Sequence, residues 1–561
     1  MEDVLKEAFH NPEVDKNALT AAVVRFSAFH DLQEFTPGQK IYRELIPKTK
    51  PGPGEQYAFE VDLDKCTGCK ACVTACHNEN GLDEDETWRS VGFLQGGTSE
   101  NPVAQHVTTA CHHCAEPACM TGCPTKAYVK DAATGIVKHL EDQCFGCQYC
   151  ILKCPYDVPK YNPKRGIVHK CDMCIGRLNA GEAPACARAC PTGAIRITLV
   201  KTEDVKKNFE EFVRVPDAPA SNYTYPTTRY TTSRTWPQNT VSVDYLTAKP
   251  EHSHLPLVVM LILTQASVGT FLAQMILKKI LPAELNQLLF PVHIWIALAT
   301  GLLALAASIF HLGRPHLAFR AILGLKTSWL SREILAFGLF ANLAVTYAVC
   351  GHWENAARTV GKFLGGPAVL DVLGSAVFLS GLIGVLCSVM VYRDTQRPFW
   401  DNHWTTLKFL MTTALLGSAL SLSISFVYTA HQAPYLIFSV KEIVGRMFCL
   451  AILGFSVAKM ILESGIFYYL RKDDRNFLKK TAVLMTRPLK NVTAWRFVLG
   501  VLGGIALPSL ILALNSKVVN SPLLASLAFL SFLLLLAGEF LERYLFFRAV
   551  VPLKMPGGKV N

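Results

Sequence analysis

Several features of a secreted or soluble catalytic protein are scarce in this sequence. Charged residues make up only 18% of the 561 residues and hydrophobic residues 50%, which is too apolar for an ordinary soluble enzyme. No apolar run precedes residue 250 and no twin-arginine pair lies near the N-terminus, so we expect no export signal. We find no motif for pterin binding, nucleotide binding or nucleophilic catalysis.

Cysteine is nearly absent outside one segment. Of the 19 cysteines, 16 lie between Cys66 and Cys190, and we interpret Cys350, Cys387 and Cys449 as small core residues in apolar stretches. Such clustering in a long chain argues against a disulfide scaffold. The net charge of +11 fits basic loops beside a membrane, so we expect a lipid membrane and no nucleic acid as a partner.

The clustered cysteines form four groups. They are Cys66, Cys69, Cys72 and Cys76; Cys111, Cys114, Cys119 and Cys123; Cys144, Cys147, Cys150 and Cys154; and Cys171, Cys174, Cys186 and Cys190. The first and third groups have the C-x2-C-x2-C-x3-C spacing of bacterial ferredoxins. The other two lengthen the interval before the third cysteine without losing one, and His77 replaces the proline that follows the last cysteine elsewhere. Zinc usually takes two separated C-x2-C pairs per ion, so the pattern favours iron–sulfur clusters that transport single electrons.

The sequence becomes strongly apolar from Leu255. Eight stretches are long enough to cross a bilayer, near 255–278, 290–311, 330–350, 369–391, 405–428, 443–463, 496–514 and 523–546. An even number puts both termini on one side, and the loops on that side hold most of the Lys and Arg residues between spans. The positive-inside rule then predicts a multi-pass inner-membrane protein whose iron–sulfur domain lies in the cytoplasm.

Composition divides the chain into four parts. We predict an N-terminal docking extension at 1–55, a ferredoxin-like domain at 56–215, an irregular linker at 216–254 and a membrane anchor at 255–561. The fold class is therefore an α+β ferredoxin-like domain followed by an all-α eight-helix transmembrane bundle.

Four polar residues should meet where spans 2 and 3 reach the iron–sulfur side: His311, Arg314, Ser331 and Glu333. Ionisable groups at this depth are functional candidates, and a quinone needs polar groups at its carbonyls and a route for protons. The alternatives are that His311 only caps its helix and that Arg314 only orients the protein.

Haem and active proton pumping are not expected. A bis-histidine haem needs two histidines at matching depth on facing helices, but His293, His352 and His431 lie near the far-side ends of spans and no histidine lies mid-membrane. A pump would need buried charges along a path, but Lys459, Glu463, Glu539 and Glu542 lie toward the cluster side.

The four cysteine groups resemble those of the iron–sulfur subunit of the dimethyl sulfoxide reductase family of molybdenum enzymes. The motifs His311-Leu-Gly-Arg-Pro, Thr327-Ser-Trp-Leu-Ser-Arg-Glu-Ile and Gly538-Glu539 resemble its eight-helix, haem-free anchor. The resemblance implies that groups one and four interleave, as do groups two and three. The implied ligand sets are Cys66, Cys69, Cys72 and Cys190; Cys171, Cys174, Cys186 and Cys76; Cys111, Cys114, Cys119 and Cys154; and Cys144, Cys147, Cys150 and Cys123. Since no cysteine is replaced, four [4Fe-4S] clusters are implied.

The resemblance also implies a function. A separate molybdopterin catalytic subunit would exchange electrons through the clusters with the quinone pool, as menaquinone or ubiquinone, near His311. Its substrate would be sulfite, through oxidation, or a sulfoxide, through reduction. The alternatives are a polysulfide-reductase-like energy-conserving complex and a structural tether whose clusters serve only stability.

Overall fold

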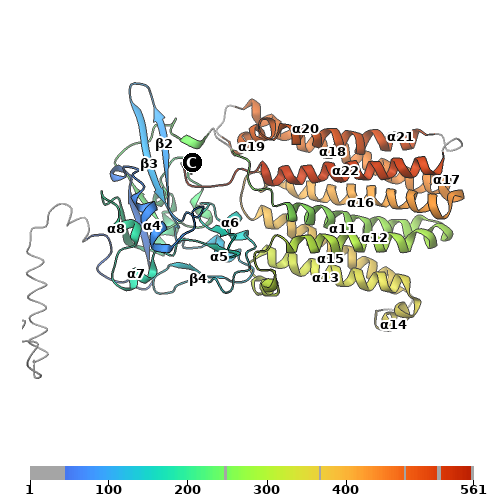
Figure 1. Cartoon of the computed structure of the whole chain (residues 1–561), viewed down its shortest axis with the longest axis horizontal. Coiled ribbons are helices and arrows are strands. Elements are labelled where there is room, and N and C mark those ends of the chain that lie inside the picture. Colours follow the sequence, from blue (N-terminus) through green and yellow to red (C-terminus); the bar gives the residue numbers. More distant parts are fainter. Residues whose placement is uncertain (1–43, 246–248, 365–367, 473–475, 515–519, 557–561) are drawn as a thin grey trace, which may run out of the picture.

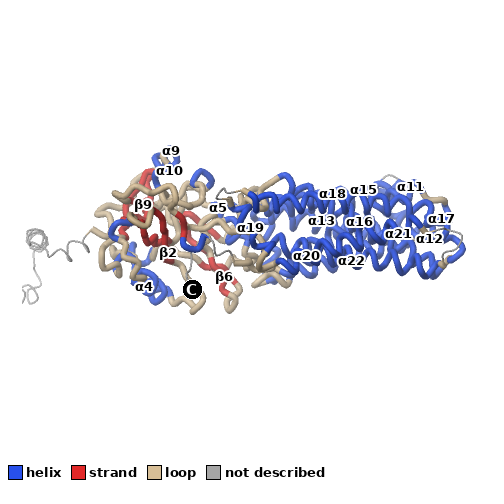
Figure 2. Tube along the Cα trace, turned by 90° about the horizontal axis from the view of Figure 1, so that it is seen from above, coloured by secondary structure: helices blue, strands red, loops and turns tan. Residues whose placement is uncertain are grey.

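The chain forms an elongated molecule with two parts, shown by a computed structural model (Figure 1). The structure describes residues 44–245, 249–364, 368–472, 476–514 and 520–556. Strands and short helices occupy one end, and long helices fill the other (Figure 2). We call these parts the module and the bundle. Most of the predicted docking extension, 1–55, lies outside the described residues.

Two three-stranded sheets and two hairpins frame the module. In the first sheet β1 (Glu55–Asp62) lies between β8 (Ile195–Lys201), which is antiparallel, and β9 (Arg229–Thr231), which is parallel. In the second, β2 (Ser90–Gly97) lies between β3 (Pro102–Thr109) and β10 (Val241–Ser242). The hairpins pair β4 (Tyr128–Lys130) with β5 (Val137–His139), and β6 (Lys160–Asn162) with β7 (Ile167–His169).

Short helices follow the cysteine loops and complete the module. They are η1 (Leu63–Lys65), α4 (Ala71–Asn80), α5 (Ala118–Thr121), α6 (Tyr149–Lys153), α7 (Ile175–Asn179), α8 (Ala185–Arg188), α9 (Thr202–Lys207), α10 (Phe209–Phe212), η2 (Ser221–Tyr223) and η3 (Val243–Tyr245). The segment predicted as a linker, 216–254, adds β9 and β10 to the two sheets. It therefore lies against the module over much of its length.

Seven helices of the bundle are long and apolar enough to cross a membrane among the residues that the structure describes. They are α11 (Leu255–Ile280), α12 (Ala283–Ile309), α13 (Trp329–His352), α15 (Val369–Arg393), α16 (His403–Gln432), the run Lys490–Ala513, and α22 (Ser521–Arg548). The run Lys490–Ala513 comprises α20 (Lys490–Val501), a π-helical turn η9 (Leu502–Ala506) and α21 (Leu507–Ala513).

The remaining predicted span, 443–463, is also helical. It continues from α17 (Ile437–Val440) through a π-helical turn η7 (Lys441–Gly445) into α18 (Arg446–Ser464), which packs with α16. It differs from the other seven in carrying the buried charges Lys459 and Glu463, and it is not among the helices that length and composition alone identify as spans. With this helix the bundle has eight long helices, and the module and the C-terminal tail lie at the same end (Figure 1).

Shorter elements connect these helices. They are η4 (Pro315–Gly324), α14 (Glu354–Leu364), η6 (Pro434–Leu436), η8 (Gly465–Arg471) and α19 (Phe477–Thr486).

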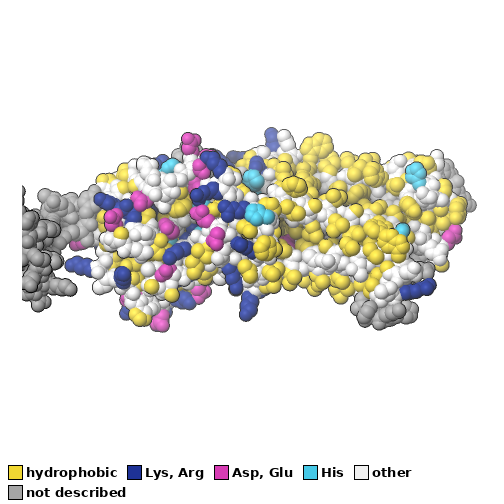
Figure 3. Space-filling model, turned by 60° about the horizontal axis from the view of Figure 1, so that its bottom comes forward, with side chains coloured by type: hydrophobic (Ala, Val, Ile, Leu, Met, Phe, Trp, Pro, Cys, Tyr) yellow, Lys and Arg dark blue, Asp and Glu magenta, His cyan; other side chains and the backbone are white. Residues whose placement is uncertain are grey.

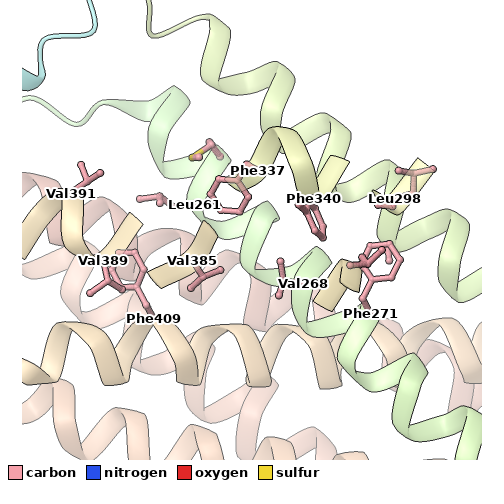
Figure 4. Close-up of a cluster of buried hydrophobic side chains, with 14 of the residues drawn as sticks. Leu261, Val268, Phe271, Leu298, Phe337, Phe340, Val385, Val389, Val391 and Phe409 are labelled. Atoms are coloured by element: carbon pink, nitrogen blue, oxygen red, sulfur yellow. The ribbon is translucent and has the colours of Figure 1, made fainter. Parts of the chain in front are cut away.

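Interlocking apolar side chains form the bundle core (Figure 4). Phe271 of α11 lies with its ring centroid 5.8 Å from that of Phe340 of α13, and Val385 of α15 is fully buried in the same cluster. On another face of α11, a Cβ added to Gly269 would lie 2.9 Å from the Cα of Gly417 in α16. Small residues thus let these two helices approach closely, as is common in membranes. On the face that Figure 3 shows, the surface of the bundle is mostly hydrophobic, whereas charged side chains gather over the module.

Backbone contacts join the module to the bundle. A Cβ on Gly313, just after α12, would collide with the carbonyl of Gly166, and one on Gly146 would lie 3.0 Å from the Cα of Gly313. The charged pair Lys153 and Asp394 (2.7 Å) closes the same junction. The loop that holds the third cysteine group is therefore fixed against the end of the bundle.

Candidate functional site

The four C-x2-C loops share one backbone turn. In each, the residue before the second cysteine has positive φ: Gly68 (74°), His113 (42°), Gly146 (74°) and Met173 (61°). Successive backbone N–H groups in such turns form concave anion-binding nests, which are common at iron–sulfur sites. The C-x2-C spacing in the sequence thus corresponds to the same backbone turn in all four groups.

Two small cavities in the module are each lined by four cysteines from two groups. One is lined by Cys66, Cys69, Cys72 and Cys190. The other is lined by Cys111, Cys114, Cys119 and Cys154. In each cavity three cysteines come from one group and the fourth from its interleaved partner.

The remaining cysteines also gather across groups. The thiol of Cys171 is close enough to Cys111, Cys76 and Cys186 for their charges to interact, and Cys174 interacts with Cys186. The thiol of Cys150 interacts in the same way with Cys147, Cys144 and Cys123. Two of the four implied sets thus line cavities, and the other cysteines lie near one another across groups, while the ligand sets themselves stay predictions.

The chemistry of these sets fits iron–sulfur clusters. Among the described residues, no three His, Cys, Asp or Glu side chains converge closely enough to hold a single metal ion. Burial raises the pKa of Cys76 to about 12 and that of Cys154 to about 11. Thiolates at these positions need a bound cationic centre, since metal coordination removes the proton outright.

Two buried cations lie among the cysteines. Arg89 is 2% exposed, and its Nη1 donates to Thr108 Oγ1 (3.2 Å), which lies 3.5 Å from Cys72 Sγ. Lys170 is 3% exposed, and its Nζ lies 3.7 Å from Cys111 Sγ. Neither forms a salt bridge with a carboxylate in the described part of the chain. Burial alone would lower the pKa of Arg89, but the sulfurs of Cys186 and Cys72 raise it overall.

A cavity of about 280 Å³ lies where the module meets the bundle. Its walls come from the third cysteine loop, from the start of α11, from the end of α12 and the turn after it, and from α13 and α15. They include Phe145, Cys147, Gln148, Tyr149, Leu152, His254, His311, Glu333, Phe337 and Tyr392. At its outer edge Ile309 and Ile334 are 50% and 38% exposed, toward the lipid-facing surface of α12 and α13. We call this the junction cavity.

His311 and Glu333 both line the junction cavity. Burial lowers the pKa of His311 to about 4, opposed by hydrogen bonding with the backbone of Cys147, so the imidazole is neutral near pH 7. Glu333 is 6% exposed and accepts a short hydrogen bond from Ser388 Oγ. A neutral imidazole and a carboxyl group therefore share an apolar cavity with a cluster cysteine, Cys147.

Arg314 and Ser331, predicted with them, do not line this cavity. Arg314 instead binds the module: its backbone N–H donates to the Phe145 carbonyl (3.0 Å), and its guanidinium donates to the carbonyls of Arg165 (3.2 Å) and Glu141 (2.9 Å). Ser331 is fully buried, and its hydroxyl has no hydrogen-bond partner among the described residues. Arg314 therefore helps to position the third cysteine loop beside the cavity.

Sequence reasoning missed several lining residues. Gln148 and Tyr149 directly follow Cys147, and His254 directly precedes the first span. Their nearness to a cysteine group and to a span boundary was a usable signal. Their convergence depends on the docking of module and bundle, which spacing does not encode.

Comparisons with known families cover both parts of the chain. The family described as DMSO reductase anchor subunit (DmsC) matches residues 250–548. A 4Fe-4S dicluster domain matches residues 103–199, and a 4Fe-4S binding domain matches residues 57–78. The matches divide the sequence where the structure changes from module to bundle.

Curated relatives match the module. The B subunit of anaerobic dimethyl sulfoxide reductase from Haemophilus influenzae is 34% identical over 181 residues, covering 31% of this chain and 87% of the relative. Its counterpart in Escherichia coli K12 is 34% identical over 179 residues, covering 30% and 86%. The formate dehydrogenase iron-sulfur subunit of H. influenzae is also 34% identical, over 180 residues, covering 29% and 56%.

Proposed function

Because the chain belongs to the DMSO reductase anchor subunit family and begins with an iron–sulfur module like the B subunit of that reductase, we propose that it links a catalytic subunit to the quinone pool. The fusion joins in one polypeptide an electron-transfer module and a membrane anchor. A partner of the molybdopterin class would perform the substrate chemistry, and this chain would move the electrons.

The four cysteine sets would hold four [4Fe-4S] clusters. Their ligands would be the sixteen cysteines between Cys66 and Cys190, in the four sets that the resemblance implies, and the two cavities lined by four cysteines each support this. Clusters bound there would each take up and give up one electron. We include no haem among the proposed cofactors.

The two ends of this series have different surroundings. Cys69 is exposed, and the helices α4 and α8 near its cavity lie at the end of the module away from the bundle (Figure 1). Cys147 instead lines the junction cavity. Electrons would therefore exchange with the catalytic subunit near Cys69 and with a quinone near Cys147.

The junction cavity would take the head of menaquinone or ubiquinone. The observation that supports this most is that one apolar cavity, next to the lipid-facing surface, contains both His311 and Glu333 and is lined by a cluster cysteine. The imidazole and the carboxyl group would bind the two carbonyl oxygens, since ring oxygens need polar partners in an apolar site. Arg314 and Ser331 would support the site from outside it.

The decisive experiment uses His311→Ala in the complete complex in native membranes. We expect quinol to lose its ability to reduce the clusters, while dithionite still reduces them, as followed by electron paramagnetic resonance. His316→Ala is the matched control because His316 is exposed and does not line the cavity. If quinol still reduced the clusters normally in His311→Ala, the assignment of the quinone site to His311 would be wrong.

The substrate and sidedness are tested separately. The basic loops at the module end favour a cytoplasmic module, where sulfite oxidation is our first candidate. We would measure quinone reduction by sulfite in membranes with and without the chain. Sulfite-dependent reduction that disappears in the deletion supports this direction. Its absence favours quinol-driven reduction of a sulfoxide, and the similarity to a formate dehydrogenase subunit adds formate to the same panel.

A further inference from the structure

A second cavity adjoins the junction cavity. It measures about 350 Å³ and lies among the module, the segment before α11, the turn after α15 and the C-terminal tail. Its charged or titratable lining residues are Tyr156, Asp157, Lys160, Glu251, His252, His254, Arg397 and Lys554. We call it the vestibule. His252 is exposed, so the vestibule reaches water on the module side.

The two cavities share part of their walls. Three residues line both of them: Gln148, Leu152 and His254. Of these only His254 has a side chain that can take up and release a proton. The apolar cavity that contains His311 and Glu333 and the polar vestibule are thus separated by a wall that contains one imidazole.

His254 is held in an unusual conformation at this wall. It has φ 45° and ψ 49°, the left-handed region, directly before α11, and its side chain does not cap that helix. Its Nδ1 is buried without a hydrogen-bond partner among the described residues. A left-handed conformation costs an ordinary residue about 1–2 kcal/mol, and such strain gathers at functional sites.

Other rings extend from His254 into both cavities. Its centroid lies 5.1 Å from that of His311 in the junction cavity and 4.7 Å from that of His252 in the vestibule. Phe547 of α22 packs on it at 5.6 Å. Burial, with smaller contributions from His311, His252 and Arg397, lowers the pKa of His254 to about 3. The ring is therefore neutral at rest and holds a proton only transiently.

We propose that His254 transfers protons between the junction cavity and the vestibule, so that quinone chemistry exchanges its protons with water on the module side. This inference rests on the proposed quinone site. Oxidation of one quinol to quinone releases two electrons and two protons. The electrons leave singly through clusters bound at the cysteines, and each proton passes His254 into the vestibule. Reduction of quinone reverses both flows.

The test uses His254→Ala in the complete complex, kept anaerobic, with reduced menadione as the quinol. Cluster reduction is followed by stopped-flow absorbance over a range of quinol concentrations. We expect the limiting rate to fall on the order of a hundredfold, a usual contribution of general acid–base groups, with the quinol concentration for half-maximal rate unchanged. Imidazole added to the buffer should restore much of the rate, because it can occupy the space left by the side chain.

Two further variants separate proton transfer from structure. His254→Gln keeps a polar side chain of similar reach but cannot carry a proton, so it should be as slow as His254→Ala and gain nothing from imidazole. His252→Gln is the matched control, and it should react nearly as fast as the parent because water enters the vestibule directly. Electron paramagnetic resonance after dithionite confirms that every variant retains its clusters.

The outcomes are distinct. A parental rate in His254→Ala overturns the proton route and leaves the quinone site intact. A higher half-maximal quinol concentration without rescue by imidazole also overturns it, because His254 would then bind quinol or shape its cavity. If menadiol and the native quinol both fail to reduce the clusters of the unaltered complex, the proposed function fails first and the inference fails with it.

Discussion

Buried cations are treated differently in the module and in the bundle. In the bundle, Lys459 is fully buried and forms an ion pair with Glu539, which also pairs with Arg496 (2.8 Å). Arg496 in turn pairs with Glu463 (2.9 Å). In the module, Arg89 and Lys170 are just as buried but have no carboxylate partner within the described residues.

The difference indicates what the module contains when it is complete. A buried charge without an opposite charge is very costly, so proteins pair it or place it beside a bound ion. A [4Fe-4S] cluster with four thiolates has a net negative charge, and Arg89 and Lys170 lie next to cysteine sulfurs. The bundle balances the charges of Lys459 and Arg496 within the polypeptide, whereas Arg89 and Lys170 require the clusters to do so.

The largest effect is therefore expected from removing iron. Stripping the clusters should leave two buried cations uncompensated and unfold the module, since metal binding and folding are coupled, worth on the order of 10 kcal/mol in a structural zinc site. The bundle should remain helical. Limited proteolysis with mass spectrometry measures this, with fragments of residues 255–548 as the internal control. A module that resists protease without iron would contradict the comparison.

Glu539→Gln is expected to have the next largest effect. It removes the acceptor that Lys459 and Arg496 share and leaves a buried positive charge, a change that typically destabilises by about 3–5 kcal/mol. Thermal unfolding of the detergent-solubilised complex, followed by circular dichroism, measures it. The double variant Lys459→Met, Glu539→Gln removes one charge of each sign and should recover part of the loss. Equal stability of the single and double variants would argue that charge balance is unimportant here.

Replacing Arg89 by Leu is expected to change the reduction potentials of the clusters more than the free energy of unfolding. Removing a positive charge makes adding an electron harder, so the potentials of the clusters beside Cys72 and Cys186 should fall by roughly 50–100 mV. Redox titration with electron paramagnetic resonance measures the shift. Arg89→Lys keeps the charge and should keep the potentials near the parental values.

The paired cation Lys153 provides the matched control for Arg89. It lies near Cys119 but forms a salt bridge with Asp394 (2.7 Å). The double variant Lys153→Met, Asp394→Asn removes a pair with no net charge, so cluster potentials should change little. Shifts as large as those of Arg89→Leu would show that pairing does not decide the effect.

Local patterns predicted much of this architecture. Cysteine spacing gave the four groups, because three ligands of a cluster come from one short loop whose turn is visible in residues such as Gly68 and Gly146. Apolar length gave the long helices. The family and the fold class are confirmed by the comparisons. The ligand sets and the quinone site stay predictions.

The remainder depends on contacts between distant segments. Arg314 was predicted beside a quinone, but it donates to carbonyls of the module, because the turn after α12 docks there. His254 was overlooked because its role depends on a wall shared by two cavities. The helix that includes Lys459 buries charges that are paired with glutamates of its own and of a neighbouring helix, and hydropathy cannot register such pairing.

The smallest effect is expected from an exposed ion pair of the bundle, Lys278 of α11 with Asp371 of α15 (2.6 Å). Their side chains are 27% and 70% exposed, so water screens both charges, and such pairs contribute about 0–1 kcal/mol. Lys278→Met should therefore leave the unfolding temperature of the solubilised complex nearly unchanged. Both Lys278→Met and Glu539→Gln break an ion pair between helices, but only Glu539 is buried. Comparing their unfolding temperatures therefore separates the effect of burial from the effect of pairing. A loss as large as that of Glu539→Gln would mean that an ion pair stabilises the bundle whether or not it is buried. The effect of Glu539→Gln could then not be attributed to burial.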